Sequence, residues 1–335
     1  MIEAFLNNIS YYLPEKTLTN LDINKSHPEW EVDKISSKTG IKTRHIAAEN
    51  EFSSDMAIKA AEILFNEHSI QREEIEFLIF CTQSPDYNLP TNACIIQDKL
   101  NLPKSIGAFD INLGCSGYVY GLSIAKAFIS SGLVKNVLLI TSDTYSKYIN
   151  PNDKSNKTIF GDAASATFLS SENKCGWRIG DFIFGTDGKG AEDLIVKNSG
   201  LKYSSNTNDE NIFEGNKFIK NNNNLFMNGQ KIFSFTSKSV PLLVNQVLKK
   251  NNLSESAVNA YLFHQANKFM LDFIRKKIKI DSSKFIEYIE DVGNTVSSTI
   301  PIALKEEGFY KDYENIVLAG FGVGYSWGGC VLFKN

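Results

Sequence analysis

The sequence predicts an α/β protein assembled from two similar halves. Short apolar segments typical of strands alternate with longer segments that have the periodicity of amphipathic helices. Comparable strands are also similarly spaced, with 59 residues between Ile79 and Leu138 and 55 residues between Leu262 and Val317. Two copies of one α/β unit explain this spacing, although two ordinary alternating stretches could also produce it by coincidence.

The predicted elements follow the same order in each half. The first half, residues 1–172, has a helix capped by Ser54, a strand at 76–81, a helix near 91–100, a strand at 106–113, a helix at 118–129 and a strand at 136–141. The second half, residues 173–335, has a helix at 231–250, a strand at 258–263, a basic helix at 267–279, a strand at 285–289, a helix ending near Glu307 and a strand at 315–319.

The composition excludes several classes of protein. The chain of 335 residues is 42% hydrophobic and 22% charged, which allows a large core, and its net charge of −3 gives no basic field for nucleic acid. Its five cysteines form no CxxC pair, so we expect no disulfide framework and no metal site, and a reducing cytoplasm. We also expect no signal peptide and no membrane span, because no stretch approaches the roughly 18 apolar residues that a span needs.

Cys115 is the first candidate for chemistry. It lies in a Gly114–Gly117 turn between a predicted strand and a predicted helix. Unpaired N–H groups and the dipole at a helix N-terminus favour a thiolate, which is the nucleophilic form of cysteine. The position therefore suits a covalent thioester intermediate. The alternative is a small buried cysteine that only fills space.

His264 and Asn294 are the second and third candidates. His264 ends an apolar strand, and Asn294 lies in a turn before a predicted helix. Taken singly, each is as well explained as a structural histidine or a turn asparagine. The duplication changes this interpretation, because it places both residues at strand ends equivalent to the one that bears Cys115. A thiol, an imidazole and an amide at such ends form a plausible acyl-transfer site.

Three further segments have simpler explanations. Residues 320–329 hold five glycines, but no Lys-Ser/Thr pair follows them, so we expect a hairpin that offers backbone N–H groups to a substrate and not a phosphate loop. The GTDGKG segment at 185–190 predicts a hairpin turn, and the Asn-rich stretch at 203–224 predicts an exposed excursion.

Together, the GCSG motif around Cys115, FHQAN at 263–267 and GNT at 293–295 make the chain resemble the β-ketoacyl-acyl-carrier-protein synthase III family of the thiolase superfamily. The resemblance covers nearly the whole chain. It implies a five-layered αβαβα thiolase-like fold, a homodimer and no cofactor. It also implies two substrates, an acyl-thioester on coenzyme A or acyl carrier protein, and malonyl-acyl carrier protein.

The resemblance further implies a role for each motif residue. Cys115 would accept the acyl group, while His264 and Asn294 would bind the thioester carbonyl of the malonyl group as carbon dioxide leaves. The backbone N–H groups of Cys115 and Val323 would form the oxyanion hole. Asn267, in the same HQAN motif, would belong to the substrate-binding residues.

Several positions depart from the family pattern. Val323 replaces a glycine. In the family, a tryptophan and an arginine sandwich the adenine of coenzyme A, and Lys34 and Lys154 stand at these positions in this chain. Trp30 is nearby but shifted by four residues. We therefore expect acyl-carrier-protein donors to outperform coenzyme A donors. Phe269 replaces an arginine. Leu89 replaces a tunnel phenylalanine, which would admit a longer or branched acyl group.

The basic helix resembles the carrier-protein docking face of the family through Arg275, Lys276, Lys277 and Lys279. An ordinary solvated basic face explains these residues equally well.

Related reactions remain as alternatives. A thiolase needs a second catalytic cysteine in the glycine-rich loop, and this chain has no cysteine before Gly322 in that loop. A hydroxymethylglutaryl-CoA synthase needs a glutamate base, and this chain has Gln83 at that position. A non-condensing acyltransferase of a specialised pathway would keep the cysteine and histidine and tend to lose the asparagine, so Asn294 favours condensation. An inactive subunit that pairs with a catalytic relative would be expected to lack Cys115.

Overall fold

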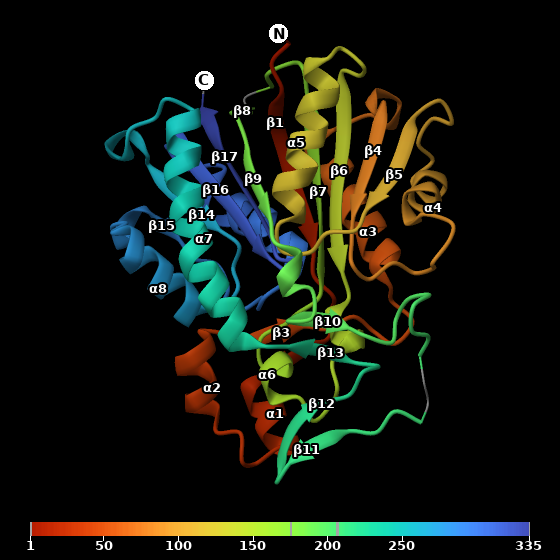
Figure 1. The fold of residues 1–335 in the computed structure, drawn as a ribbon. Coiled ribbons are helices and arrows are strands. Elements are labelled where there is room, and N and C mark those ends of the chain that lie inside the picture. The colour runs from red at the N-terminus through yellow and green to blue at the C-terminus, as the bar shows by residue number, and fades with distance from the viewer. Residues whose placement is uncertain (1, 175, 206–207, 335) are drawn as a thin grey trace.

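The computed structural model describes residues 2–174, 176–205 and 208–334, and its centre is an eleven-stranded mixed sheet (Figure 1). The first half contributes β1 (Phe5–Tyr12), β4 (Phe77–Cys81), β5 (Gly107–Ile111), β6 (Asn136–Asp143) and β7 (Ala163–Ser170). The second contributes β8 (Trp177–Ile179), β9 (Ile183–Thr186), β14 (Ala260–Phe263), β15 (Phe285–Ile286), β16 (Asn315–Gly322) and β17 (Ser326–Lys334).

The strand order demonstrates the duplication. One half runs β5-β4-β6-β7-β1 and the other runs β15-β14-β16-β17-β8. In both, the first three strands are parallel and the next two pairings are antiparallel. The two halves of the sheet meet where β1 pairs with β8. We propose that the boundary between them lies between residues 172 and 173.

The helices also repeat. α3 (Ser53–His68), α4 (Asn92–Lys99) and α5 (Gly117–Ser130) in the first half correspond to α7 (Gly229–Lys250), α8 (Lys268–Ile278) and α9 (Thr299–Ala303) in the second. α5 contacts strands of both halves, α3 packs on β1 and β7, and α7 packs on β16 and β17. The five layers are therefore α3/α4, the first group of strands, α5/α9, the second group of strands and α7/α8, which confirms the predicted thiolase-like architecture.

Three apolar clusters hold these layers together. The central cluster surrounds α5 and α9 and includes Val119, Leu122 and Ile300, each of which is buried. A second cluster packs α3 and α4 on the first strands, and a third packs α7 and α8 on the second. Burial of this apolar surface is the main force that fixes the layers.

Smaller elements gather at one end of the molecule (Figure 1). They are α1 (Asn20–Ser26), α2 (Val32–Thr39), α6 (Lys154–Lys157), β2 (Thr17–Thr19), β3 (Thr43–His45), β10 (Leu194–Val196), β11 (Ile212–Glu214), β12 (Lys217–Lys220) and β13 (Leu225–Met227). None of the helices in the described ranges is long and apolar enough to cross a membrane.

Local expectations meet different outcomes. The glycine-rich segment forms the β16–β17 hairpin, as predicted. Ser54 does not cap α3: the helix begins at Ser53, where the Asp55 carboxylate accepts a hydrogen bond from the Phe52 N–H at 2.9 Å, while the Ser54 hydroxyl binds Asp86. The capping prediction was wrong because Ser54 lies inside the helix, where its N–H and its hydroxyl both donate to Asp86.

The GTDGKG segment is also not a hairpin turn. β9 pairs with β17, and the chain continues through a short 3₁₀ turn at Gly188–Gly190. The stretch 203–224 is an excursion whose visible part includes the exposed β11–β12 hairpin, and positions 206–207 within it lie outside the described residues.

Candidate active site

The Cys115 turn is held against the β16–β17 hairpin. The Ser116 and Ser326 hydroxyls lie 2.6 Å apart, and Cys115 directly precedes Ser116, the N-cap of α5. A Cβ atom on Gly322 would lie 2.7 Å from Cys115 Sγ, closer than real Cβ contacts allow. Glycine at this position is therefore what lets the hairpin backbone approach the thiol.

His264 follows the last residue of β14. Its backbone N–H donates to the Ala319 carbonyl of β16 at 2.8 Å, and its ring Nδ1 lies 2.7 Å from the Thr299 hydroxyl at the start of α9. The side chain is only 2% exposed, and burial lowers the pKa of the imidazole to about 3. The ring is therefore neutral throughout the physiological pH range.

Asn294 is clamped by its own turn and by residues of the first half. Its N–H donates to the Ile159 carbonyl and its carbonyl accepts from the Gly161 N–H, both at 3.0 Å. Its side-chain Oδ1 accepts the Val296 N–H at 3.0 Å, and Nδ2 donates to the Ala266 carbonyl at 3.3 Å. These bonds fix the orientation of the carboxamide.

One small cavity of about 80 Å³ joins the three side chains. Cys115, His264 and Asn294 all line it, together with Asn267 and apolar side chains from α7, α8 and β16. All three are nearly buried, at 5%, 2% and 4% exposure. The structure thus brings a thiol, a neutral imidazole and an oriented amide to one water-poor space.

The thiol experiences two opposing influences. Burial raises the pKa of Cys115 to about 12, while backbone hydrogen bonds from Val323 and from Cys115 itself act to lower it. The expectation that the helix N-terminus produces a thiolate is therefore wrong for this resting state, because desolvation outweighs the two backbone hydrogen bonds. The same two N–H groups are the predicted oxyanion donors, so both are directed at the sulfur atom where a thioester would form.

We expect the rate at which iodoacetamide alkylates Cys115 to rise about tenfold per pH unit from about pH 6 to about pH 9, without a plateau. Below a raised pKa, each pH unit increases the reactive thiolate fraction by that factor. Peptide mass spectrometry would separate Cys115 from the exposed Cys94. A plateau below about pH 8 would contradict the raised pKa.

Other predicted substrate residues do not reach this cavity. Leu89 is 81% exposed and Phe269 is 62% exposed, with the Phe269 ring stacked on Phe233. Lys34 is paired with Glu31 at 2.7 Å on the surface of α2. Only Asn267 lines the cavity, and its side chain also caps α8 by accepting the Met270 N–H at 2.9 Å.

The expected adenine platform is displaced and covered. Lys154 Nζ lies 5.6 Å from the centroid of the Trp30 ring, so the two residues do lie together. Trp30 is only 6% exposed, however, because His27 stacks on it with ring centroids 3.9 Å apart. Neither face of this indole is open for a purine in this conformation.

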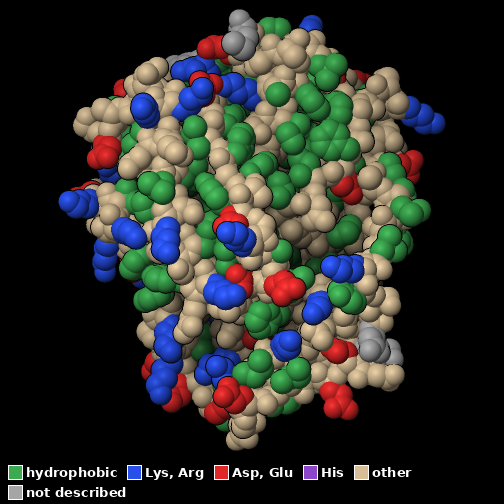
Figure 2. Space-filling model, viewed as in Figure 1, with side chains coloured by type: hydrophobic (Ala, Val, Ile, Leu, Met, Phe, Trp, Pro, Cys, Tyr) green, Lys and Arg blue, Asp and Glu red, His purple; other side chains and the backbone are tan. Residues whose placement is uncertain are grey.

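The four basic residues predicted as a docking face on α8 have different surroundings. Arg275 turns back to its own helix end, where Nη1 donates to the Ile280 carbonyl at 3.2 Å. Lys276, Lys277 and Lys279 are exposed and belong to no ion pair among the described residues. Figure 2 shows several basic side chains on the part of the surface where Figure 1 places α8.

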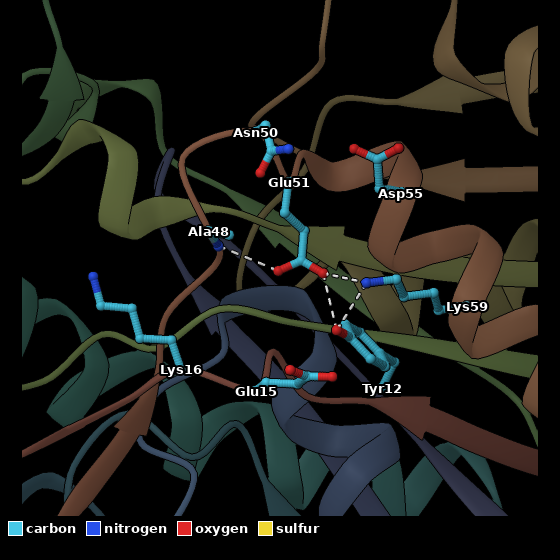
Figure 3. A pocket seen from close by; sticks show the side chains of 8 residues that line it. All are labelled: Tyr12, Glu15, Lys16, Ala48, Asn50, Glu51, Asp55 and Lys59. Atoms are coloured by element: carbon cyan, nitrogen blue, oxygen red, sulfur yellow. Dashed lines mark hydrogen bonds and ion pairs between the residues drawn. The ribbon is translucent and has the colours of Figure 1, made fainter.

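A larger surface cavity of about 680 Å³ lies elsewhere (Figure 3). Three of its polar groups bind one another: the Glu51 carboxylate accepts hydrogen bonds from Tyr12 at 2.9 Å and from Lys59 at 2.6 Å. The described residues that line the cavity include no cysteine, serine or histidine, so its size does not make it the site of a cysteine thioester. Within the described parts of the chain, no group of three or more His, Cys, Asp or Glu residues could hold a metal ion.

Some neighbours of the site were not identified from the sequence. Thr299 contacts the His264 ring, Ile159 holds the Asn294 backbone, and Tyr145 donates a hydrogen bond to Gln83 beside the Cys115 turn. Thr299 lies in the Ser/Thr-rich segment that follows the GNT motif, and Ile159 lies in the TIFGD segment at 158–162. Only the fold reveals which of these side chains face the site.

A duplicated thiolase-like fold with Cys, His and Asn on one cavity defines a class: acyltransferases that work through a cysteine thioester. Residues 109–188 match the family described as 3-oxoacyl-[acyl-carrier-protein] synthase III, and residues 248–333 match the C-terminal region of the same family.

Full-length relatives agree. The chain is 36% identical to the β-ketoacyl-[acyl-carrier-protein] synthase III of Clostridium tetani over 96% of this chain and 95% of that protein. It is also 36% identical to the synthase of Clostridioides difficile, over 98% of both. A crystal structure of a 3-oxoacyl-(acyl-carrier-protein) synthase III superposes with a TM-score of 0.95 and 43% identity, covering 99% of this chain and 100% of that one. The chain belongs to the β-ketoacyl-acyl-carrier-protein synthase III family.

Proposed function

We propose that this protein catalyses a decarboxylative Claisen condensation between an acyl group held on Cys115 and a malonyl group delivered by acyl carrier protein. The observation that carries the proposal is the single cavity shared by Cys115, His264 and Asn294. The full-length similarity to synthases of this name supports the same reaction.

In the first half-reaction, the Cys115 sulfur attacks the carbonyl carbon of an acyl-thioester. The new C–S bond forms as the bond to the carrier sulfur breaks, and the thiol proton passes to the departing carrier thiolate. The N–H groups of Cys115 and Val323 stabilise the oxyanion of the tetrahedral intermediate, a role supported by their hydrogen bonds to the sulfur.

In the second half-reaction, the malonyl group loses carbon dioxide, and its electron pair is held as an enolate. His264 and Asn294 donate hydrogen bonds to the enolate oxygen. The carbanion then attacks the Cys115 thioester, the Cys115 sulfur leaves and takes up a proton, and a β-ketoacyl thioester remains on the carrier. Neutral donors in a buried cavity are effective here because the negative charge develops only as the reaction proceeds.

Thr299 holds the His264 ring in place. Its hydroxyl lies 2.7 Å from Nδ1 and donates to the Val296 carbonyl at 3.1 Å. The role proposed for His264 requires the ring proton on Nε2, the nitrogen that Thr299 does not contact. The fixed Asn294 carboxamide favours condensation over simple acyl transfer, which has no enolate to bind.

Intact-mass measurement after incubation with acyl-thioesters tests the proposal. We expect a gain of one acyl group on Cys115, and loss of that gain when malonyl-acyl carrier protein is added. An adduct that malonyl-carrier protein leaves in place, but that an alcohol or amine removes, would contradict condensation.

We also propose that carrier protein docks on Lys276, Lys277 and Lys279 of α8. These exposed cations suit an acidic partner, and they lie on the helix whose first turn lines the cavity. Reversing the charge of Lys276 and Lys277 to glutamate should raise the KM for malonyl-carrier protein about tenfold at low salt. The matched variant Lys250→Glu, at the far end of α7, should leave it unchanged, and equal KM values in both variants would refute the docking face.

Finally, we propose a cytoplasmic homodimer joined through β5. This strand lies at the edge of the sheet, and its residues are only partly buried (Figure 1). An unpaired edge strand with half-exposed Phe109 and Ile111 is a natural place for a second copy to add. The exposed Leu89 lies on a loop that follows the neighbouring strand β4. Sedimentation equilibrium should give twice the mass of one chain, and a monomer at micromolar concentration would refute this arrangement.

A further inference from the structure

Gln83 and Tyr145 form a polar wall beside Cys115. We propose that this wall selects a short acyl group that carries an uncharged oxygen, such as a hydroxyacyl or oxoacyl group, over an alkyl chain of the same size. The inference rests on the proposed function, because it concerns the acyl group that Cys115 would hold.

A second cavity, of about 220 Å³, adjoins the first through Leu194, which lines both. It is lined by Gln83, Tyr145, Tyr148 and Val323, among others. Val323 also supplies a backbone hydrogen bond to the Cys115 sulfur. An acyl group whose oxygen binds the Val323 N–H would therefore have this cavity available for its chain.

The Gln83 carboxamide is fixed at the nucleophile. Its Oε1 accepts a hydrogen bond from the Tyr145 hydroxyl at 2.7 Å, and its backbone N–H donates to Asp143 at 2.8 Å. A Cβ atom on Gly114, the residue before Cys115, would lie only 2.4 Å from this Oε1. Tyr145 is 3% exposed, so the hydroxyl that holds the amide is itself held by packing.

This arrangement leaves a donor for the substrate. Once Oε1 is occupied by Tyr145, Nε2 of Gln83 makes no hydrogen bond within the described residues, although Gln83 lines the cavity. An alkyl chain would displace water from Nε2 without replacing its hydrogen bond, which is costly. A chain with an oxygen acceptor would satisfy it. Sites of this kind discriminate strongly against analogues that lack the polar group.

The charge of the residues that line the cavity further limits the class of acyl group that fits it. None of the described residues that line it is basic, so a carboxylate on the acyl chain would lie there without a counter-ion. A neutral hydroxyl or ketone oxygen therefore fits better. Leu89, the position expected to set chain length, lines neither cavity of the single chain.

A matched pair of donors tests this selection. We would compare 3-hydroxybutyryl and 3-methylbutyryl thioesters of one carrier, which differ by an oxygen in place of a methyl group, and measure the rate of mass gain on Cys115. The wild-type protein should react at least about tenfold faster with the hydroxyacyl donor.

Two variants localise the effect. Gln83→Leu removes the donor at similar volume and should abolish or reverse the preference. Tyr145→Phe removes the hydrogen bond that orients the amide and should reduce the preference. Gln71→Leu makes the same substitution at an exposed residue outside both cavities and should leave the preference unchanged.

The outcomes distinguish failure of the acyl-group selection from failure of the proposed function. Equal rates, or faster reaction with the methyl analogue in the wild-type protein, would overturn the selection while leaving the thioester mechanism intact. An undiminished preference in Gln83→Leu would do the same, and if that variant does not fold, Tyr145→Phe decides. No adduct from either donor or from acetyl and butyryl thioesters would instead overturn the proposed function, and the selection with it.

Discussion

Replacing Cys115 with alanine should abolish the acyl adduct and lower the rate of condensation at least about 10⁴-fold. The buried cavity offers no second nucleophile: His264 is neutral and is proposed as a donor, and Cys330 lies downstream in β17. Without the sulfur, the acyl group has no covalent attachment beside the malonyl site. The measurement is β-ketoacyl product formed per enzyme per minute, with intact mass recorded in parallel.

The control for this variant is the partial reaction that does not need the thiol. Cys115→Ala should still release carbon dioxide from malonyl-carrier protein, because His264 and Asn294 remain in place. Retention of more than a tenth of the condensation rate in a folded Cys115→Ala protein would show that another group accepts the acyl chain.

Asn294→Ala should have the second largest effect. It removes one of two donors to the enolate oxygen, and deletion of such a donor typically costs about 10²- to 10³-fold. The loss should appear in carbon dioxide release from malonyl-carrier protein. Formation of the acyl adduct on Cys115 should be nearly unchanged, since the oxyanion hole for that step is built from backbone N–H groups.

A conservative variant separates chemistry from folding. Asn294→Asp keeps the size of the side chain and can still accept the Val296 N–H, but a carboxylate opposes the developing negative charge. It should be as poor in decarboxylation as the alanine variant. Decarboxylation that proceeds normally in either variant would remove Asn294 from the mechanism and reopen simple acyl transfer.

Much of the fold was predictable because its signals are local and repeated. Equivalent strand spacing predicted the duplication, and the observed strand orders match it. The GCSG, HQAN and GNT motifs each fall in a turn at a strand end or helix start, where short sequences are informative. Ser54 was misassigned because the helix starts one residue earlier and the Ser54 hydroxyl donates to Asp86, a contact that the local sequence does not reveal.

The environment of the site was less predictable, since it arises from contacts over long sequence separations. The Thr299 hydroxyl meets His264 only when β14 and α9 come together, and Tyr145 meets Gln83 only when the ends of β6 and β4 adjoin. The direction of the Cys115 pKa shift was missed for the same reason. A helix start can be predicted from the sequence, whereas the burial of the Cys115 thiol cannot.

The family pattern was less informative about residues at the surface. Lys34 and Lys154 occupy the positions expected to bind adenine. Trp30, four residues before Lys34, is the residue whose ring lies near the Lys154 ammonium group. Side chains on such exposed segments are set by local packing, here by the His27–Trp30 stack, more than by their place in an alignment.

The most direct test of condensation at the Cys115, His264 and Asn294 cavity is the ratio of carbon dioxide released to β-ketoacyl-carrier protein formed. With an acyl-thioester and malonyl-carrier protein as substrates, the wild-type enzyme should give one molecule of each per turnover. Transfer of the acyl group to another acceptor without release of carbon dioxide would contradict this account.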